Sequence, residues 1–165
     1  MEIGMSKNTI KPIRRILFPT DFSPAANAAF GYAERLAAST GAGILVLHVP
    51  QDSATVGPLN NVAGEKRRQL QAVRSQLPDV DIERIFYAGA PGEVICWIAQ
   101  EYRCDQIVMG THGRTGLINL LMGSVAEHVV RHARCPVLTV PSRPRGEAPL
   151  KDPAIDFPPP MIQPL

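Results

Sequence analysis

Residues 105–124 read DQIVMGTHGRTGLINLLMGS, and this stretch decides the fold. Its fixed points have the spacing Gly-x2-Gly-x9-Gly-Ser and are Gly110, Gly113, Gly123 and Ser124. An apolar run precedes the first glycine, and a helical pattern at 125–134 follows the serine. Glycines let backbone N–H groups approach an anion closely, and the start of a helix offers unsatisfied donors. We therefore predict a phosphate-binding loop here, and nucleotide binding as the leading function.

Apolar runs and helical patterns alternate along the rest of the chain. The runs predict strands at residues 14–19, 44–49, 82–87, 105–109 and 136–140. The helical patterns cover residues 25–40, 62–77, 91–102 and 125–134. Such alternation implies right-handed crossovers and a parallel sheet covered by helices on both faces. We predict a three-layer, doubly wound α/β domain with a five-stranded parallel sheet in the order 3-2-1-4-5.

The first helix carries clear boundary signals. Ser23 is a typical N-cap, and Pro24 suits the first helical position because its fixed φ matches the helix. Gly41 is expected to end the helix, since glycine readily adopts the left-handed conformation found there. The next run, ILVLHV at 44–49, is apolar at nearly every position. Such a run is typical of a strand that is buried on both faces.

Two unusual loops should meet at one edge of the sheet. In a doubly wound sheet, ligands bind at the carboxyl ends of the strands where the strand order reverses. The reversal here lies between the first and fourth strands. Pro19-Thr20-Asp21 follows the first strand, and the glycine loop follows the fourth. We predict that these loops form a single site.

Three residues of this site allow two interpretations each. Asp21 either accepts hydrogen bonds from a base or a ribose, or forms the turn ahead of Ser23. Met109 either lines the pocket or belongs to the core. Ser124 serves a phosphate through its hydroxyl and N–H, or caps the helix that follows.

Other phosphate-binding motifs and several function classes are disfavoured. The glycine loop lacks the Gly-Lys-Ser/Thr of a Walker A loop, and Gly-x-Gly-x-x-Gly is missing after the first strand. The chain has 17 basic and 15 acidic residues, a net charge of +2 that is too balanced for a nucleic-acid surface. No apolar stretch approaches the roughly 20 residues of a membrane span. The N-terminus lacks the apolar region of a secretory signal.

We divide the chain into three parts. Residues 1–12 form an N-terminal extension, and residues 13–141 form the α/β domain. Residues 142–165 are rich in proline and are expected to be disordered or bound to a partner. The three cysteines contain no Cys-x-x-Cys pair, so reduced, buried thiols are expected. They are Cys96, Cys104 and Cys135.

The chain resembles the universal stress protein family, in its nucleotide-binding, UspA-like form. The resemblance rests on the glycine motif and on the opening ILFPTDFS at 16–23. LVLHV at 45–49 and CPVLTV at 135–140 match as well. It covers residues 13–141.

The resemblance implies a five-stranded α/β fold that binds ATP, which Mg²⁺ can accompany, in its cytoplasmic and usually dimeric members. Carried over by position, one group of residues would surround the adenine and ribose: Pro19, Thr20, Asp21, Val49, Met109 and Gly110. A second group would hold the phosphates: Gly113, Arg114, Gly123, Ser124 and Val125. The last strand, at 137–140, would pair across a homodimer interface.

Three functions remain open for such a pocket. The first is a nucleotide-binding regulator with at most slow ATP hydrolysis. The second is an ATP-hydrolysing or adenylate-transferring enzyme, in which Arg114 would contact the γ-phosphate and His112 would act as a base. Related hydrolases grip pyrophosphate with a glycine-containing loop after strand one, whereas residues 19–24 here lack glycine. The third is a family member that uses the pocket for another ligand.

The remaining conspicuous side chains have simpler interpretations. His128 and His132 have the i, i+4 spacing of a zinc pair, but the sequence lacks the glutamate of His-Glu-x-x-His. We therefore predict a solvated or interface face there. His48 is expected in the core rather than at the pocket, and Trp97 as a core or interface anchor.

Overall fold

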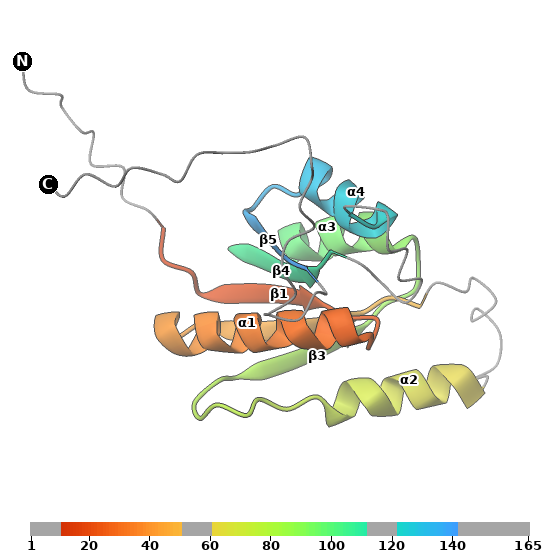
Figure 1. Cartoon of the computed structure of the whole chain (residues 1–165), viewed down its shortest axis with the longest axis horizontal. Coiled ribbons are helices and arrows are strands. Elements are labelled where there is room, and N and C mark those ends of the chain that lie inside the picture. Colours follow the sequence, from red (N-terminus) through yellow and green to blue (C-terminus); the bar gives the residue numbers. More distant parts are fainter. Residues whose placement is uncertain (1–10, 51–60, 112–121, 142–165) are drawn as a thin grey trace, which may run out of the picture.

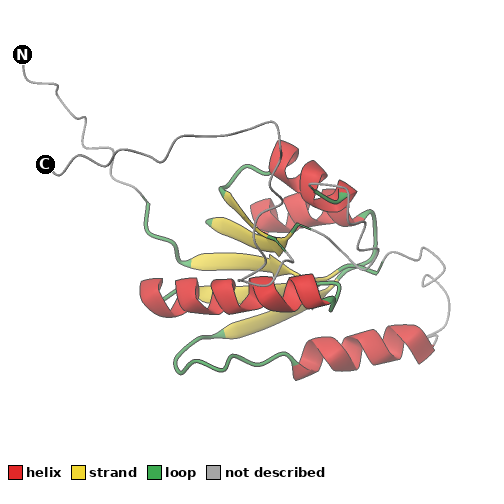
Figure 2. Cartoon of the chain, viewed as in Figure 1, coloured by secondary structure: helices red, strands yellow, loops and turns green. Residues whose placement is uncertain are grey.

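The structure confirms the predicted alternation of strands and helices. The computed structural model describes residues 11–50, 61–111 and 122–141 (Figures 1 and 2). The elements in chain order are β1 (Arg15–Pro19), α1 (Pro24–Thr40), β2 (Gly43–His48), α2 (Asn61–Ala72), β3 (Ile82–Phe86), α3 (Pro91–Glu101), β4 (Gln106–Gly110), α4 (Ser124–His132) and β5 (Val137–Val140).

The strands form one parallel sheet in the order β3-β2-β1-β4-β5, as predicted. The central strand, β1, pairs with β2 on one side and with β4 on the other. In this register Ile16 lies opposite Ile44 of β2 and Gln106 of β4. The strand order reverses between β1 and β4, so the crevice that accommodates ligands in such sheets lies beyond the ends of these two strands.

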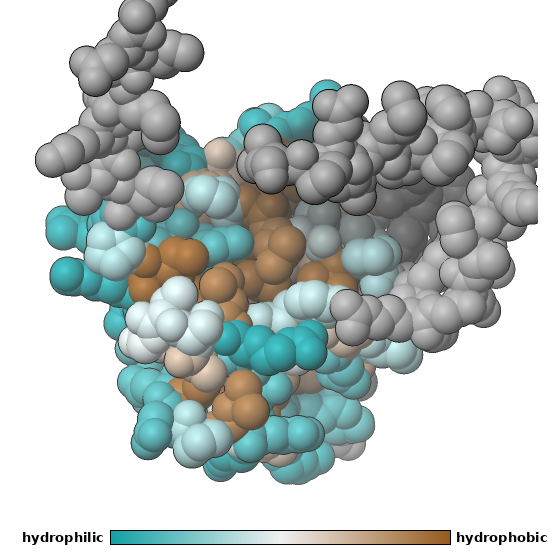
Figure 3. Space-filling model, turned by 60° about the vertical axis from the view of Figure 1, so that its left-hand side comes forward, coloured by the Kyte–Doolittle hydropathy of each residue, from teal (hydrophilic) through white to brown (hydrophobic). Residues whose placement is uncertain are grey.

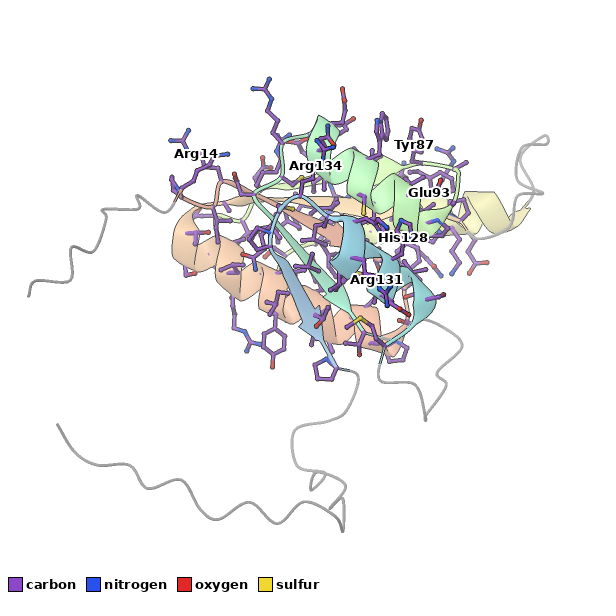
Figure 4. All side chains as sticks on the ribbon, turned by 90° about the horizontal axis from the view of Figure 1, so that it is seen from above. Arg14, Tyr87, Glu93, His128, Arg131 and Arg134 are labelled. Atoms are coloured by element: carbon purple, nitrogen blue, oxygen red, sulfur yellow. The ribbon has the colours of Figure 1, made fainter. Side chains whose placement is uncertain are left out.

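Helices cover both faces of the sheet, with α1 and α2 on one side and α3 and α4 on the other (Figures 1 and 4). Successive strand residues point to opposite faces, so each strand supplies both layers of core. The core under α3 and α4 includes Leu17, Leu45, Ile98, Ile107 and Val129. The core under α1 and α2 includes Ile16, Ala29, Ala33, Ile44 and Leu70.

The boundaries of α1 follow the predicted signals. The Ser23 side chain accepts a hydrogen bond from the Ala26 N–H at 3.2 Å, and Pro24 opens the helix. Gly41 ends it with φ 70°, where a side chain would be strained. Both signals act within a few residues, which is why they could be recognised without knowledge of the tertiary structure.

The second helix is shorter than predicted: α2 ends at Ala72 rather than at residue 77. The Gln76 N–H donates to the Glu34 carboxylate of α1 at 2.7 Å, so it is not available to a helical carbonyl. Glu34 is itself buried. A tertiary hydrogen bond therefore replaces the final turn of the predicted helix.

The described surface is mixed in polarity. Figure 3 shows one face on which apolar patches lie among hydrophilic residues. Within residues 11–50, 61–111 and 122–141, the helices are too short or too polar to cross a membrane.

Candidate functional site

The loop after β1 is held by its own side chains and by β2. The Thr20 N–H donates to the Leu47 carbonyl at 2.8 Å, and the Thr20 hydroxyl accepts from the Phe22 N–H at 3.0 Å. The Asp21 carboxylate accepts from the Ser23 N–H at 3.0 Å. The turn-forming interpretation of Asp21 is thus confirmed, while its contact with a ligand stays a prediction.

The end of β4 lies against the first turn of α1. Gly110 belongs to the strand and is paired with Val140 of β5. A Cβ atom on Gly110 would lie 3.1 Å from the backbone carbonyl carbon of Ala25 and 3.2 Å from its oxygen. A glycine is needed here because two backbones approach closely, a steric role that the sequence did not indicate. The contact also fixes the β1 loop and the end of β4 at one edge of the sheet.

Thr111 joins the end of β4 to the start of α4. Its N–H donates to the Val140 carbonyl at 3.0 Å, and its carbonyl accepts from the Gly123 N–H at 2.7 Å. The side chain is buried. The chain on both sides of residues 112–121 is therefore anchored at the carboxyl edge of the sheet.

The N-terminus of α4 begins at a glycine. Gly123 is the N-cap, with φ −72° and ψ 154°, and makes no side-chain hydrogen bond to the helix. The suggestion that Ser124 caps α4 is wrong, because Ser124 is the first helical residue, and it is exposed. The first N–H groups of a helix have no intrahelical acceptor, and Val125 lies among them. These donors and the positive end of the helix dipole suit a bound anion.

Two residues predicted to line the adenine pocket belong to the core. Val49 is 8% exposed and Met109 is 6% exposed, and both pack in the cluster under α3 and α4. The core interpretation of Met109 is thus confirmed. Pro19 ends β1 opposite Leu47 and is likewise buried. A contact between these residues and a nucleotide stays a prediction.

Residues 112–121 of the glycine loop lie outside the described residues, and three of them have predicted roles. They are His112, Gly113 and Arg114. Their predicted roles, as possible base, phosphate-binding glycine and γ-phosphate ligand, stay predictions.

His48 is more closely tied to the site than the sequence suggested. It is buried, as expected of a core residue, and its Nδ1 is 2.7 Å from the Thr20 carbonyl oxygen. Its ring lies between those of Phe22 and Phe86, with centroids 4.7 and 5.5 Å away. Phe22 had no predicted role of its own, because its ring contacts involve residues far away in the sequence.

The histidines of α4 form a stacked pair. The rings of His128 and His132 have centroids 4.2 Å apart, and His132 Nδ1 lies 2.8 Å from the His128 carbonyl oxygen. Figure 4 shows His128 beside the start of α3, where Gly92 leaves room for its ring. His132 is exposed, in agreement with a solvated or interface face. In the described part of the chain, no three His, Cys, Asp or Glu side chains gather as a metal site would require.

Trp97 and the cysteines complete the predicted features. Trp97 is 47% exposed, and its ring lies tilted against that of Tyr87 with centroids 5.2 Å apart, so the core alternative is wrong and the interface alternative stays open. All three cysteines are described, and they are free thiols, but only Cys104 is buried; Cys96 and Cys135 are half-buried, so the prediction of buried thiols is wrong for these two. Burial raises the pKa of the Cys104 thiol to about 12, with a smaller contribution from Cys135. Cys104 is thus an inert core residue.

The chain is similar to proteins of known family. Universal stress protein MJ0577 of Methanocaldococcus jannaschii is 29% identical over 152 residues, which cover 77% of this chain and 94% of that protein. Universal stress protein MJ0531 of the same organism is 33% identical over 145 residues, covering 81% and 85%. The solved structure of MJ0577 superposes with a TM-score of 0.73 at 30% identity, covering 82% of this chain and 99% of that one.

Two more distant structures contain nucleotides. A universal stress protein in complex with cAMP has a TM-score of 0.57 and covers 81% of this chain and 100% of its own. A family protein from Arabidopsis thaliana with AMP bound has a TM-score of 0.54 and covers 87% and 99%. Each is 24% identical to this chain, so the likeness shows a shared fold.

The model of the universal stress protein family matches residues 12–141, which span the whole sheet and its helices. The chain therefore belongs to the universal stress protein family.

Proposed function

We propose that this protein binds an adenine nucleotide, ATP with Mg²⁺, and acts as a nucleotide-dependent regulator with at most slow hydrolysis. The base and ribose would lie against the β1 loop and the end of β4, and the phosphates at the start of α4. The proposed binding residues are Pro19, Thr20, Asp21, Val49, Met109, Gly110, Gly113, Arg114, Gly123, Ser124 and Val125.

The observation that carries this proposal is the meeting of two chain segments at the strand-order reversal. The N-cap of α4 is Gly123, which has no side chain to accept from the first N–H groups of the helix, so these groups can serve an anion. The Gly110–Ala25 contact brings the end of β4 to the start of α1, directly after the β1 loop. Donors for phosphate and oxygen acceptors for a ribose or base thus share one edge of the sheet.

The comparisons support the ligand class. The fold accommodates cAMP in one related structure and AMP in another, and both contain the adenosine moiety. Mg²⁺ usually keeps several waters and is bound through the phosphates of its substrate, so it needs no protein cage of its own. ATP is the extension that we propose, because the resemblance to the nucleotide-binding form of the family implies it.

We also propose a homodimer that pairs through β5 in the cytoplasm. In the described residues, β5 pairs with β4 on one side only, and Leu138 is 37% exposed. An unpaired strand edge is a natural pairing surface for a second copy. The free thiols fit a reducing compartment.

The test is a calorimetric titration of the purified chain with ATP and Mg²⁺, with GTP as the comparison. We expect saturable binding of ATP and weaker binding of GTP. Mass analysis of ligand released on denaturation should identify a co-purified adenine nucleotide. Lack of both binding and co-purified nucleotide would contradict the proposal, whereas steady turnover of ATP would favour the enzymatic alternative.

A further inference from the structure

Three aromatic rings form a row along the carboxyl edge of the sheet. Phe22 follows β1, His48 ends β2 and Phe86 ends β3. The centroid distances are 4.7 Å from Phe22 to His48 and 5.5 Å from His48 to Phe86. We call these three residues the aromatic row. It runs from the proposed nucleotide loop to the edge strand of the sheet.

Helix α2 places a cation over each end of this row. The Lys66 ammonium lies 5.1 Å from the centroid of the Phe22 ring, and the Arg67 guanidinium lies 4.2 Å from that of Phe86. Cations at these distances are attracted to the faces of aromatic rings. Two consecutive residues of one helix thus contact two rings, one in the loop after β1 and one at the end of β3.

The rest of the attachment of α2 is slight. Of its described side chains, from residue 64 to residue 72, Leu70 alone is buried. By contrast, α1 buries Ala25, Ala26, Ala29, Ala33, Glu34 and Ala37. Figure 1 shows α2 beside β3, at the outer side of the sheet. A helix with so few buried contacts opens more readily than the helices around it.

Phe22 is held in a backbone conformation that it would not adopt by itself. Its φ is 63°, in the left-handed region, where a bulky residue is a genuine outlier. Such conformations persist only where the surroundings impose them. Here the Thr20 hydroxyl accepts the Phe22 N–H, while His48 and Lys66 contact the ring. The contacts of Phe22 therefore help to fix the loop that contains Thr20 and Asp21.

We infer that α2 is a clamp, with Lys66 and Arg67 as positioning residues that keep the β1 loop in its binding conformation. The link to the nucleotide rests on the proposed function. When α2 is docked, the aromatic row holds Phe22 and the turn before it; when α2 opens, Phe22 can relax toward an ordinary conformation. Because coupling between two sites is reciprocal, nucleotide binding must strengthen the docking of α2 by the factor by which docking strengthens binding.

The test measures amide hydrogen exchange of the full chain by mass spectrometry. In the free protein, Lys66→Ala and Arg67→Ala should speed exchange in residues 61–72, and Lys66→Ala also in residues 20–23. The matched control is Arg68→Ala, which removes the same charge from an exposed position of the same helix. Lys66→Arg should restore slow exchange because it keeps the cation.

Nucleotide binding adds a second readout. ATP should slow exchange of α2 in the wild-type chain, and Lys66→Ala should raise the Kd for ATP about two- to fivefold, as the loss of one cation–π contact predicts. Phe22→Leu should do the same because it removes the ring face and keeps an apolar side chain. Arg68→Ala should leave the Kd unchanged.

The two proposals can fail separately. If Lys66→Ala and Arg67→Ala exchange like Arg68→Ala in the free protein, the clamp is wrong whatever the chain binds. An unchanged Kd in Lys66→Ala, beside normal ATP binding by the wild type, would also overturn it. If the wild-type chain binds no ATP, the proposed function fails, and the exchange of residues 20–23 still decides the clamp.

Discussion

Gly110 and Ala25 approach so closely that a Cβ atom on Gly110 would lie 3.1 Å from the Ala25 backbone. The contact joins the last residue of β4 to the first turn of α1. Backbone atoms cannot move aside as a flexible side chain can. The edge of the sheet that carries the proposed site is therefore built on a backbone contact that a Cβ atom at Gly110 would make unusually tight.

Gly110→Ala should destabilise the fold by about 1–3 kcal/mol, because the added methyl group overpacks a backbone contact. Chemical denaturation followed by circular dichroism measures the change. Gly31→Ala is the control, since a Cβ atom there meets nothing within 4 Å and the residue lies inside α1. That control should stabilise the chain by roughly 0.5–1 kcal/mol. Equal effects of the two substitutions would contradict the steric role of Gly110.

Gly113→Val should abolish nucleotide binding without unfolding the chain. A β-branched side chain would block the approach of the loop amides to phosphate and would resist a positive φ. Calorimetry gives the affinity, and the melting temperature reports the fold. Normal ATP binding by a folded Gly113→Val chain would show that this loop does not contact phosphate.

Asp21→Ala should weaken ATP binding by about 1–3 kcal/mol if the carboxylate faces the ligand. The carboxylate also forms the turn with the Ser23 N–H, so Asp21→Asn is the informative partner variant. Asparagine keeps an oxygen acceptor for such a turn and removes the charge. If only the melting temperature of Asp21→Ala falls while its ATP affinity is unchanged, Asp21 is a turn residue alone.

Asp105 should make stability depend on pH. Burial of this carboxyl raises its pKa, but hydrogen bonds from Lys11 and from the Arg14 and Arg15 N–H groups outweigh burial, so the pKa is lowered. A lowered pKa stabilises the fold fully above the pKa of the unfolded chain, near 3.9. That stabilisation is lost as the pH falls through the folded-state pKa.

Asp105→Asn should therefore cost about 1–3 kcal/mol at pH 7, since it removes the charge that receives these hydrogen bonds. The free energy of unfolding of both chains, measured from pH 7 to pH 3, should converge as the pH falls. Asp79→Asn serves as the comparison. Asp79 lies in another loop and has a positive φ, a conformation that asparagine also tolerates. A difference between wild type and Asp105→Asn that stays constant with pH would contradict the role of the charge.

The features predicted correctly are those whose cause is local or periodic. The N-cap at Ser23 and the end of α1 at Gly41 each depend on a few neighbouring residues. The apolar run of β2 indicated a strand buried on both faces, and the alternation of elements indicated a parallel, doubly wound sheet, for which we predicted the observed order 3-2-1-4-5. The expectation that the two loops share one edge followed from that order.

The features missed depend on partners far away in the sequence. Glu34 ends the second helix early because its carboxylate takes the Gln76 N–H, 42 residues further along. The left-handed φ of Phe22 has no signal in its residue type, which normally disfavours it. Gly110 was predicted to belong to a loop, whereas glycine is favoured there because the backbone of Ala25 in α1 approaches closely.

The hydrogen bonds of Thr111 link two events that are usually considered separately. The Thr111 carbonyl accepts from the Gly123 N–H at the start of α4, and the Thr111 N–H donates to the Val140 carbonyl at the end of β5. A shift of the helix end to which we assign the phosphates should therefore also move the end of β5. The proposed nucleotide binding at the start of α4 and the proposed pairing of subunits through β5 would therefore influence one another through Thr111.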